Sequence, residues 1–388
     1  MAAMGDDIQG HPDRGRAMIR LEHLSKFFGP PAHRTAAVDD IDLELPAGEI
    51  CVLLGPSGCG KTTTMKMINR LIQPSSGKIF IDGRDTSAMD PIALRRSIGY
   101  VIQQIGLFPH KTIADNICVV PDLLGWDRRK SRARARELLE LVGLQPDLFC
   151  KRYPKELSGG QQQRVGVLRA LAADPPVMLM DEPFGAIDPI NREVIQDEFL
   201  KMQQTIRKTI IFVSHDLDEA VKMADKIAIL RSGKLEQYAT PEALLARPAN
   251  AFIANFLGSD RTLKRLRLLR VGAVMSAPPE SLRPDDPIST ARSLMHASGL
   301  AAMAVVDADG IAQAMLTREA AEHGGGSVSA HAEPVRASIG MDADVRSALA
   351  LMLAHDMPVL PCIDAAGRLQ GLLSYRAIVR NLGRGERA

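Results

Sequence analysis

The sequence lacks a long apolar run, a regular set of cysteines and a net charge, and each lack excludes a class of protein. No stretch of about 18 apolar residues occurs, so we expect no membrane-spanning helix. The five cysteines are scattered, odd in number and without zinc-ligand spacing, which argues against a disulfide framework. A formal net charge of +2 gives no general field toward nucleic acid, so no nucleic-acid partner is expected.

The first residues also lack the apolar core of a secretory signal. Residues 1–17 are rich in Gly, Asp, Arg and Pro and are predicted to be a flexible N-terminal tail. The chain therefore has the features of a reduced, cytosolic protein, in which any membrane role comes through a partner. Its 388 residues, 46% of them apolar, are enough for roughly two or three domains with a sizeable core.

Short apolar runs and a helical pattern alternate over residues 18–258. The runs EICVLLG (49–55), VMLMDEP (177–183) and TIIFVSH (209–215) are typical of buried parallel strands. The segment KTTTMKMINRL (61–71) has helical spacing. This alternation predicts an α/β domain with a mainly parallel sheet.

Two other segments were predicted to connect domains. Residues 259–274 are interpreted as a basic linker, because the stretch 261–270 has five basic residues and no acid. Its leucines and its cations recur every three positions, so each stripe would drift around a helix. We considered that these cations press on anionic lipid headgroups, or that the linker is only solvated. The glycine-rich segment 323–331 is predicted to be a flexible link.

Residues 275–388 contain an internal repeat. A shift of 57 residues aligns two units, 275–322 and 332–384, each predicted to run helix, strand, glycine turn, strand, helix. The shift matches identical aspartates and glycines, Asp307 with Asp364 and Gly310 with Gly367. Duplication explains this pattern, and a chance likeness of two small α/β units is the alternative.

One glycine-rich motif carries a clear phosphate-binding signal. Gly55-Pro-Ser-Gly-Cys-Gly-Lys-Thr62 fits G-x-x-x-x-G-K-[ST], follows a strand and opens a helix, as a P-loop does. Backbone N–H groups and the helix N-terminus attract phosphate, the lysine reaches the β- and γ-phosphates, and the threonine hydroxyl is placed for Mg²⁺. The alternative is a glycine turn with a solvated lysine. The candidate nucleotide-binding residues are Gly55, Ser57, Gly58, Gly60, Lys61, Thr62 and Thr63.

Two adjacent acids, Asp181 and Glu182, end a buried strand. Burying charge costs free energy, so two adjacent carboxylates at this position require a compensating partner. A Mg²⁺ ion held through Asp181 supplies one, and Glu182 would then orient or deprotonate the attacking water. An ordinary strand end that meets a helix cap is the alternative.

The sequence resembles the ATP-binding cassette (ABC) ATPases over residues 18–258. LSGGQQQR (157–164) is similar to the ABC signature. The other family motifs follow in order: Phe28 matches the aromatic residue that stacks on adenine, Gln103 the Q-loop glutamine, Asp188 the D-loop and His215 the switch histidine. The resemblance implies an α/β P-loop NTPase fold, an ABC-type nucleotide-binding domain with a helical subdomain.

The resemblance also implies a mechanism and an assembly. In this family the signature residues, here Ser158, Gly160 and Gln161, bind the nucleotide held by the partner chain, so a head-to-tail homodimer with two sandwiched ATP molecules is expected. Catalysis would rely on Glu182 as general base, on His215 at the γ-phosphate and on Gln103. The implied Mg²⁺ residues are Thr62, Gln103 and Asp181. Leu168 and Ile187 depart mildly from the family pattern, away from the phosphates.

The sequence further resembles importer ATPases for glycine betaine, choline and related osmoprotectants, and the C-terminal repeat resembles a tandem pair of CBS domains. The resemblance implies an integral membrane permease partner, an indirect solute-binding protein and a place on the cytoplasmic side of the inner membrane. CBS units that bind adenine nucleotides usually carry an aspartate three residues after a threonine or serine. Here Ala320 and Ala377 stand there, so a ligand sensor and a purely structural pair both stay open.

Two alternative functions remain. One is an importer ATPase for another small solute, such as an amino acid or a sulfonate, because the solute is chosen by subunits outside this sequence. The other is a non-transport ABC ATPase of the ribosome or of DNA repair. The single cassette and the lack of coiled-coil or zinc insertions argue against it.

Overall fold

The computed structural model describes residues 17–30, 33–103, 106–185, 187–277 and 281–387. The chain divides into two units, Met1–Leu244 with Ala249–Ile253, and Leu245–Pro248 with Ala254–Ala388. Within the described residues, none of the helices has the length and apolar character needed to cross a membrane. The predicted tail lies outside the described residues except for Ala17, where the first strand begins.

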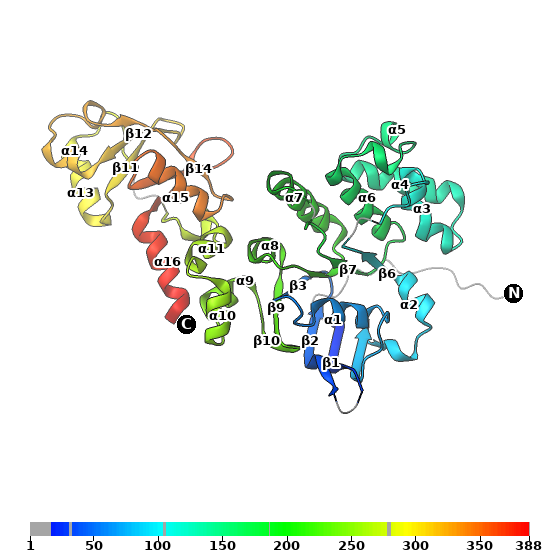
Figure 1. Cartoon of the computed structure of the whole chain (residues 1–388). Coiled ribbons are helices and arrows are strands. Elements are labelled where there is room, and N and C mark those ends of the chain that lie inside the picture. The colour runs from blue at the N-terminus through cyan, green and yellow to red at the C-terminus, as the bar shows by residue number, and fades with distance from the viewer. Residues whose placement is uncertain (1–16, 31–32, 104–105, 186, 278–280, 388) are drawn as a thin grey trace. The chain divides into compact units, whose positions relative to one another are not determined.

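A six-stranded sheet organises the first unit, in the order β10-β9-β3-β8-β7-β6 (Figure 1). The strands from β9 to β6 are parallel, and β10 pairs antiparallel with β9. The three apolar runs form three of the parallel strands, which confirms the predicted α/β class. The bounds are β3 (Ile50–Leu54), β6 (Ile98–Val101), β7 (Val177–Asp181), β8 (Thr209–Val213), β9 (Lys226–Arg231) and β10 (Lys234–Ala239).

An antiparallel sheet of four strands, β2-β1-β4-β5, packs against this one. Its strands are β1 (Ala17–Phe28), β2 (Thr35–Pro46), β4 (Ser76–Ile81) and β5 (Arg84–Asp85). Alternate residues of β1 and β2, such as Ile19 and Leu43, share one buried apolar cluster with Leu53 of β3 and Met65 of the first helix. This core fixes the strand that leads into the P-loop.

Helices fill the connections between the parallel strands. A helical insert of α3 to α6 separates β6 from β7, and α7 and α8 follow β7 and β8. The helices of this part are α1 (Lys61–Ile68), α2 (Pro91–Ser97), α3 (Ile113–Leu123), α4 (Arg128–Leu141), α5 (Pro146–Phe149), α6 (Gly159–Leu171), α7 (Pro189–Ile206) and α8 (Leu217–Met223). After β10 come α9 (Pro241–Ala246) and α10 (Ala251–Leu257), each with residues in both units. Short 3-10 turns lie at Thr86–Ala88 and Pro154–Glu156.

The second unit contains the predicted repeat. Each copy runs helix, strand, strand, helix: α13 (Ile288–Ser298), β11 (Ala302–Val306), β12 (Ala312–Thr317) and α14 (Arg318–His323), then α15 (Val345–Ala354), β15 (Val359–Ile363), β16 (Leu369–Ser374) and α16 (Tyr375–Arg387). The short strands β13 (Glu333–Pro334) and β14 (Ile339–Gly340) complete two three-stranded sheets.

The matched aspartates of the repeat make the same turn. Asp307 Oδ1 accepts the N–H groups of Asp309 and Ile311, each at 3.0 Å. Asp364 Oδ1 accepts those of Ala366 at 2.8 Å and Arg368 at 3.0 Å. The glycines that close the two turns have φ values of 80° and 79°. This shared geometry supports duplication over chance likeness.

The predicted basic linker 259–274 contains two short helices. Residues Arg261–Leu268 form α11 and Val271–Val274 form α12, and Leu266 packs in the core of the second repeat. Arg265 is buried, and its Nη1 donates to the Leu382 carbonyl at 3.1 Å, so this cation does not face lipid headgroups. The leucines of this segment do not share one buried face, as their three-residue spacing predicts: Leu266 is buried, whereas Leu263 is 57% exposed.

The glycine-rich segment 323–331, predicted to be flexible, is also fixed in place. The Ile288 N–H donates to the Gly326 carbonyl, and the Val328 N–H to the Asp286 carbonyl, both at 2.9 Å. Val328 is fully buried in the core of the first repeat, within a 3-10 turn at Val328–Ala330. The prediction was wrong because one apolar residue among glycines was enough to anchor the segment.

Candidate functional site

The glycines of the P-loop are required by close backbone approach. A Cβ on Gly55 (φ 146°) would lie 2.1 Å from the Leu230 carbonyl oxygen, and one on Gly60 (φ 106°) would lie 2.3 Å from that of Ala37. Both distances are far below contact, and both φ values favour glycine. The buried strand β3 therefore ends in a tight loop whose last residue precedes α1.

The ammonium group of Lys61 is buried against the P-loop. Its Nζ donates to the carbonyl oxygens of Gly55 at 2.7 Å and Pro56 at 3.0 Å, and the residue is 8% exposed. Both acceptors are neutral, so an anionic phosphate would be a stronger partner for this cation. The N-terminus of α1 adds partial positive charge at the same point.

The acid pair stands at the end of β7. The Thr62 hydroxyl donates to Asp181 Oδ1 at 3.3 Å, which brings two of the three predicted Mg²⁺ ligands together. Burial raises the pKa of the Asp181 carboxyl above its usual range, an effect that the Thr62 hydroxyl opposes and Glu182 strengthens. Glu182 has a left-handed φ of 45°, uncommon for a residue with a side chain.

Glu182 contacts the two other predicted catalytic residues, Gln103 and His215. Gln103 Nε2 donates to Glu182 Oε2 at 2.8 Å, and His215 Nδ1 lies 3.4 Å from Glu182 Oε1. The three residues follow β6, β7 and β8, which are neighbours in the sheet. Since carboxyl ends of parallel strands meet at one edge, the topology explains why residues so distant in sequence converge.

Glu182, His215 and the P-loop line one open cavity of about 500 Å³, and Gln103 and Asp181 lie outside its lining. The P-loop supplies most of the lining, and Glu182 and His215 complete it. The cavity is lined by Ala37, Ser57, Gly58, Cys59, Gly60, Lys61, Thr62, Thr63, Glu182 and His215. A cationic, glycine-lined pocket of this size suits a polyphosphate, with a carboxylate and an imidazole at the terminal phosphate.

The signature residues lie elsewhere. Ser158 caps the N-terminus of α6: its Oγ accepts the Gln161 N–H at 3.4 Å, and Gln161 Oε1 accepts the Ser158 N–H at 3.0 Å. Gly160 follows in the first turn, where a Cβ would lie 2.9 Å from Ile195 Cδ1 of α7. None of these three residues lines the P-loop cavity.

Two further predicted residues are placed at the edges of the site. Phe28 ends β1, is 45% exposed, and carries the Lys26 ammonium 5.2 Å from its ring centre. Asp188 directly precedes α7, and its carbonyl accepts the Arg192 N–H at 2.9 Å. Neither lines the P-loop cavity. Their roles at the nucleotide remain those that the family resemblance implies.

Sequence reasoning missed four buried or partly buried polar residues behind the site: Gln163, Arg192, Gln196 and Glu219. Gln163 Nε2 donates to the Pro183 carbonyl, which ties the signature helix to the residue after Glu182. The Glu219 carboxylate accepts hydrogen bonds from the Gln196 amide and the Ser214 hydroxyl. The sequence shows only that an acid or amide occupies an apolar position of a predicted helix. The partner of that side chain becomes visible only in the folded structure.

The cleft between the two repeats of the second unit is narrow. Its cavity of about 60 Å³ is lined in part by Thr317, Arg336 and Asp356. Small-molecule sites usually measure several hundred Å³. The hydroxyls at the nucleotide-type positions are engaged in capping, Thr317 Oγ1 with the Ala320 N–H and Ser374 Oγ with the Ala377 N–H, each at 3.2 Å. These contacts favour the structural interpretation of the pair.

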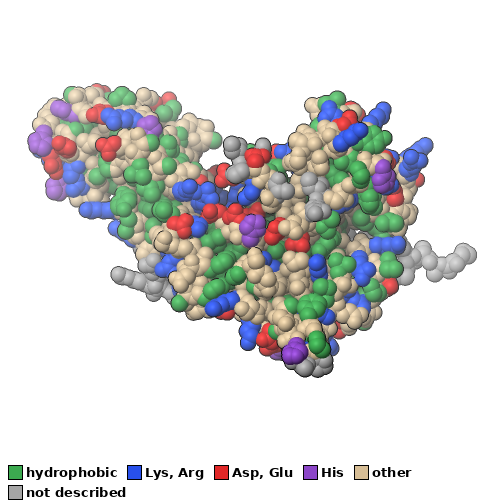
Figure 2. Space-filling model, in the orientation of Figure 1, with side chains coloured by type: hydrophobic (Ala, Val, Ile, Leu, Met, Phe, Trp, Pro, Cys, Tyr) green, Lys and Arg blue, Asp and Glu red, His purple; other side chains and the backbone are tan. Residues whose placement is uncertain are grey.

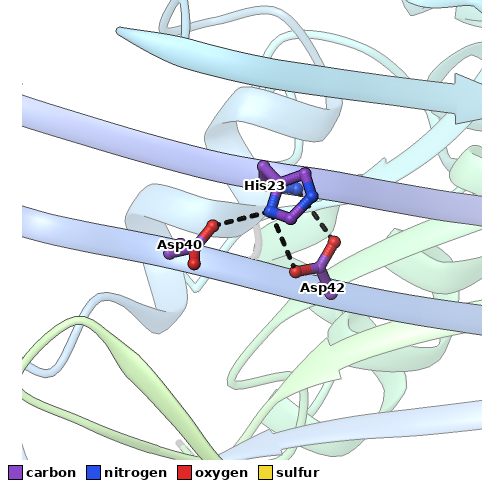
Figure 3. Close-up of side chains that lie close together, drawn as sticks. All are labelled: His23, Asp40 and Asp42. Atoms are coloured by element: carbon purple, nitrogen blue, oxygen red, sulfur yellow. Dashed lines mark hydrogen bonds and ion pairs between the residues drawn. The ribbon is translucent and has the colours of Figure 1, made fainter.

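One cluster of candidate metal ligands lies on the antiparallel sheet, formed by His23, Asp40 and Asp42 (Figure 3). His23 Nδ1 lies 2.9 Å from Asp40 Oδ1 and 3.4 Å from Asp42 Oδ2, and the His23 N–H donates to Asp42 Oδ1 at 2.9 Å. All three side chains are exposed, and the bonds among them account for the cluster. Elsewhere, basic and acidic side chains are intermixed over the visible surface (Figure 2).

Comparison with known proteins agrees with this geometry. The family model described as ABC transporter matches residues 38–185, and the one described as CBS domain matches residues 271–320 and 332–384. The osmoprotectant import ATP-binding protein OsmV of Salmonella typhimurium is 51% identical over 96% of this chain and 98% of its own length. The chain belongs to the ABC transporter family.

Other relatives and solved structures extend the match. The glycine betaine/carnitine/choline transport ATP-binding protein OpuCA of Bacillus subtilis is 46% identical over 93% of this ABC protein and 95% of its own length. A dimeric ATP-binding cassette solved in a post-hydrolysis state with ADP and phosphate is 33% identical, with a TM-score of 0.51 over 57% of this chain and 98% of that one. The ABC-type ATPase fold, followed by tandem CBS domains, is therefore shown.

Proposed function

We propose that this chain is the ATP-hydrolysing subunit of a membrane importer for osmoprotectants such as glycine betaine, choline or carnitine. The observation that carries the hydrolytic part is the contact of Gln103 and His215 with Glu182 beside the P-loop cavity. The substrate class rests on full-length similarity to importer ATPases named for these solutes.

The residues fit a complex of ATP with Mg²⁺. The Thr62 hydroxyl and the Asp181 carboxylate are hard oxygen donors that already touch, as a Mg²⁺ site requires. When bound, Mg²⁺ would neutralise charge on the β- and γ-phosphates. Gln103 is the remaining candidate ligand, and its present bond to Glu182 places it at the same edge of the sheet.

The chain's own groups then divide the work of hydrolysis. Lys61 and the N-terminus of α1 hold the phosphates and offset their charge. Glu182 accepts a proton from the attacking water, or orients it, while Gln103 and His215 fix the direction of its carboxylate. Phe28 offers an exposed ring for the adenine base.

The position of the signature residues supports a homodimer. Ser158 and Gly160 lie at a helix N-terminus outside the chain's own cavity, so they suit a nucleotide bound by a second copy. The dimeric cassette of similar fold supports the same arrangement. The subunit would act at the cytoplasmic side of the inner membrane, bound to a permease that receives solute from a binding protein.

Uptake by membrane vesicles tests the proposal. Vesicles that contain this chain, its permease and its binding protein should take up labelled glycine betaine only with ATP inside. Glu182→Gln should abolish both uptake and hydrolysis, because it removes the proton acceptor. The matched control is Glu22→Gln, which alters an exposed acid paired with Arg20 on β1 and should leave both intact. Hydrolysis without uptake of betaine, choline or carnitine would contradict the proposed substrate class.

A further inference from the structure

Two chain segments complete the hydrolytic side of the cavity. One runs from Glu182 after β7 into α7, and the other carries His215 between β8 and α8. Contact between Glu182 and His215 depends on how these segments are held relative to each other. Two side chains of α7, one turn apart on the same face, join them.

Arg192 makes the first link. Its Nη2 donates to the carbonyl of Ile187 at 2.9 Å, within the segment that follows Glu182. Its Nη1 lies 3.5 Å from Asp216 Oδ2, and Asp216 directly follows His215. One guanidinium group therefore bridges the two segments.

Gln196 makes the second link through a buried carboxylate. Its Nε2 donates to Glu219 Oε1 at 3.1 Å, and Glu219 Oε2 accepts the hydroxyl of Ser214, which precedes His215. The Ser214 hydroxyl also accepts the Asp216 N–H at 3.0 Å. Both neighbours of His215 are thus held by one network.

The network is buried, unlike an ordinary helix contact. Gln196, Ser214 and Glu219 are 3%, 1% and 7% exposed. A carboxyl in such a place is costly unless its bonds are satisfied, and a satisfied buried network fixes geometry strongly. Burial raises the pKa of the Glu219 carboxyl, against the opposing effect of the Ser214 hydroxyl.

The same two helices carry a third link that serves as an internal control. Lys222 Nζ lies 2.7 Å from Asp197 Oδ1 and donates to the Glu193 carbonyl at 3.2 Å. This contact also joins α7 to α8, at the end of α8 away from His215. If the buried network only held α7 and α8 together, loss of the Lys222 contact would reduce hydrolysis as much as loss of the Glu219 contacts.

We propose that Glu219 is a positioning residue for ATP hydrolysis, which acts with Gln196 and Arg192 to hold His215 against Glu182. This inference rests on the proposed ATPase function. Glu219 touches neither nucleotide nor the reacting water, and its effect passes through Ser214 and the backbone of His215.

Steady-state hydrolysis by the full-length chain tests the proposal. Glu219→Ala removes both acceptors and should lower kcat by roughly 100-fold, the scale expected when a catalytic group shifts by about 1 Å. The KM for ATP should change less than about threefold, because the P-loop is untouched. Glu219→Gln should restore most of kcat, since an amide oxygen still accepts the Ser214 hydroxyl after Gln196 flips.

Two more variants keep the outcome decisive. Gln196→Ala leaves the carboxyl in place and should lower kcat by about tenfold; if Glu219→Ala fails to fold, this variant and Glu219→Gln decide the matter. Lys222→Ala should leave kcat unchanged. Wild-type kcat in folded Glu219→Ala or Gln196→Ala, or an equal loss in Lys222→Ala, would overturn the proposal. A wild-type chain without ATPase activity would instead refute the proposed function.

Discussion

Buried polar side chains are distributed unequally between the two units. In the described part of the chain, every buried polar or charged side chain except Arg265 belongs to the first unit. Several of them lie at the cavity or directly behind it, among them Lys61, Gln163, Ser214 and Glu219. Burial of such groups is unfavourable unless it is compensated, so each of them needs a partner within the fold.

The second unit uses polar residues differently. Its repeated aspartates, Asp307 and Asp364, sit in exposed turns and bond the backbone that immediately follows them. Its interior is built from apolar clusters, one in each repeat and one between them. The contrast teaches that a polar residue repeated in sequence can serve only its own turn, whereas the residues of a reactive site come together from separate strands.

Removal of the buried cation of the first unit should have the largest effect. Lys61→Met should lower ATP hydrolysis by at least about 100-fold, because the ammonium faces neutral carbonyls until phosphate arrives. Phosphate release by the purified chain measures this. Lys78→Met is the control, since that exposed lysine only approaches Asp85 at 4.0 Å. Equal rates in the two variants would remove the link between burial and chemistry.

The site was predictable wherever chemistry imposes a local pattern. The P-loop glycines, the acids after β7 and the residue after β8 each stand in a short motif, and the parallel order of the strands brings them together. Glu219 and Gln196 were not predictable, because 23 residues separate them and only the packing of α7 on α8 reveals the bond. A buried acid in a helix gives no local sign of its partner.

The fold was predictable to the same extent. The apolar runs gave the buried strands, and the shift of 57 residues gave the repeat. The packing of segment 261–270 was not predictable, because its periodicity does not show that Leu266 joins a core formed far along the chain. The segment 323–331 was misinterpreted because composition alone says nothing of the backbone bonds at Gly326 and Val328.

Among the described residues of the second unit, Arg265 is the one buried charged side chain, and its substitution tests whether that burial serves stability alone. Arg265→Ala should lower the free energy of unfolding by about 1–3 kcal/mol, because the Leu382 carbonyl loses a charged donor inside the fold. Hydrolysis by the folded chain should not change. Denaturant unfolding measures the first effect, and Arg261→Ala, on the same helix but more exposed, should cost less than about 0.5 kcal/mol. A loss of activity would place Arg265 among the chemical residues.

The turn aspartates should show a smaller, symmetric effect. Asp307→Ala and Asp364→Ala each remove matching bonds to the backbone and to Gln313 or Gln370, so each should lower Tm by a similar small amount. These bonds lower the pKa of both carboxyls. Their contribution is therefore present above the ordinary aspartate pKa and is lost as pH falls through the lowered value. Thermal melts check this, with Asp309→Ala as the control in the same turn. Unequal shifts would show that the repeats have diverged in function.

The smallest effect on stability is expected at the exposed cluster of His23, Asp40 and Asp42, which belongs to the first unit and lies away from the cavity. The hydrogen bond to Asp40, helped by the charge of Asp42, raises the pKa of the imidazole above its ordinary value. Any stabilisation from this cluster is present below the ordinary histidine pKa and is lost as pH rises through the raised value. Titration of the ring by NMR should show Asp40→Asn lowering this pKa more than Asp42→Asn, with hydrolysis unchanged. Because the cluster lies away from the P-loop cavity, a loss of hydrolysis in either variant would contradict this expectation and link the cluster to the site.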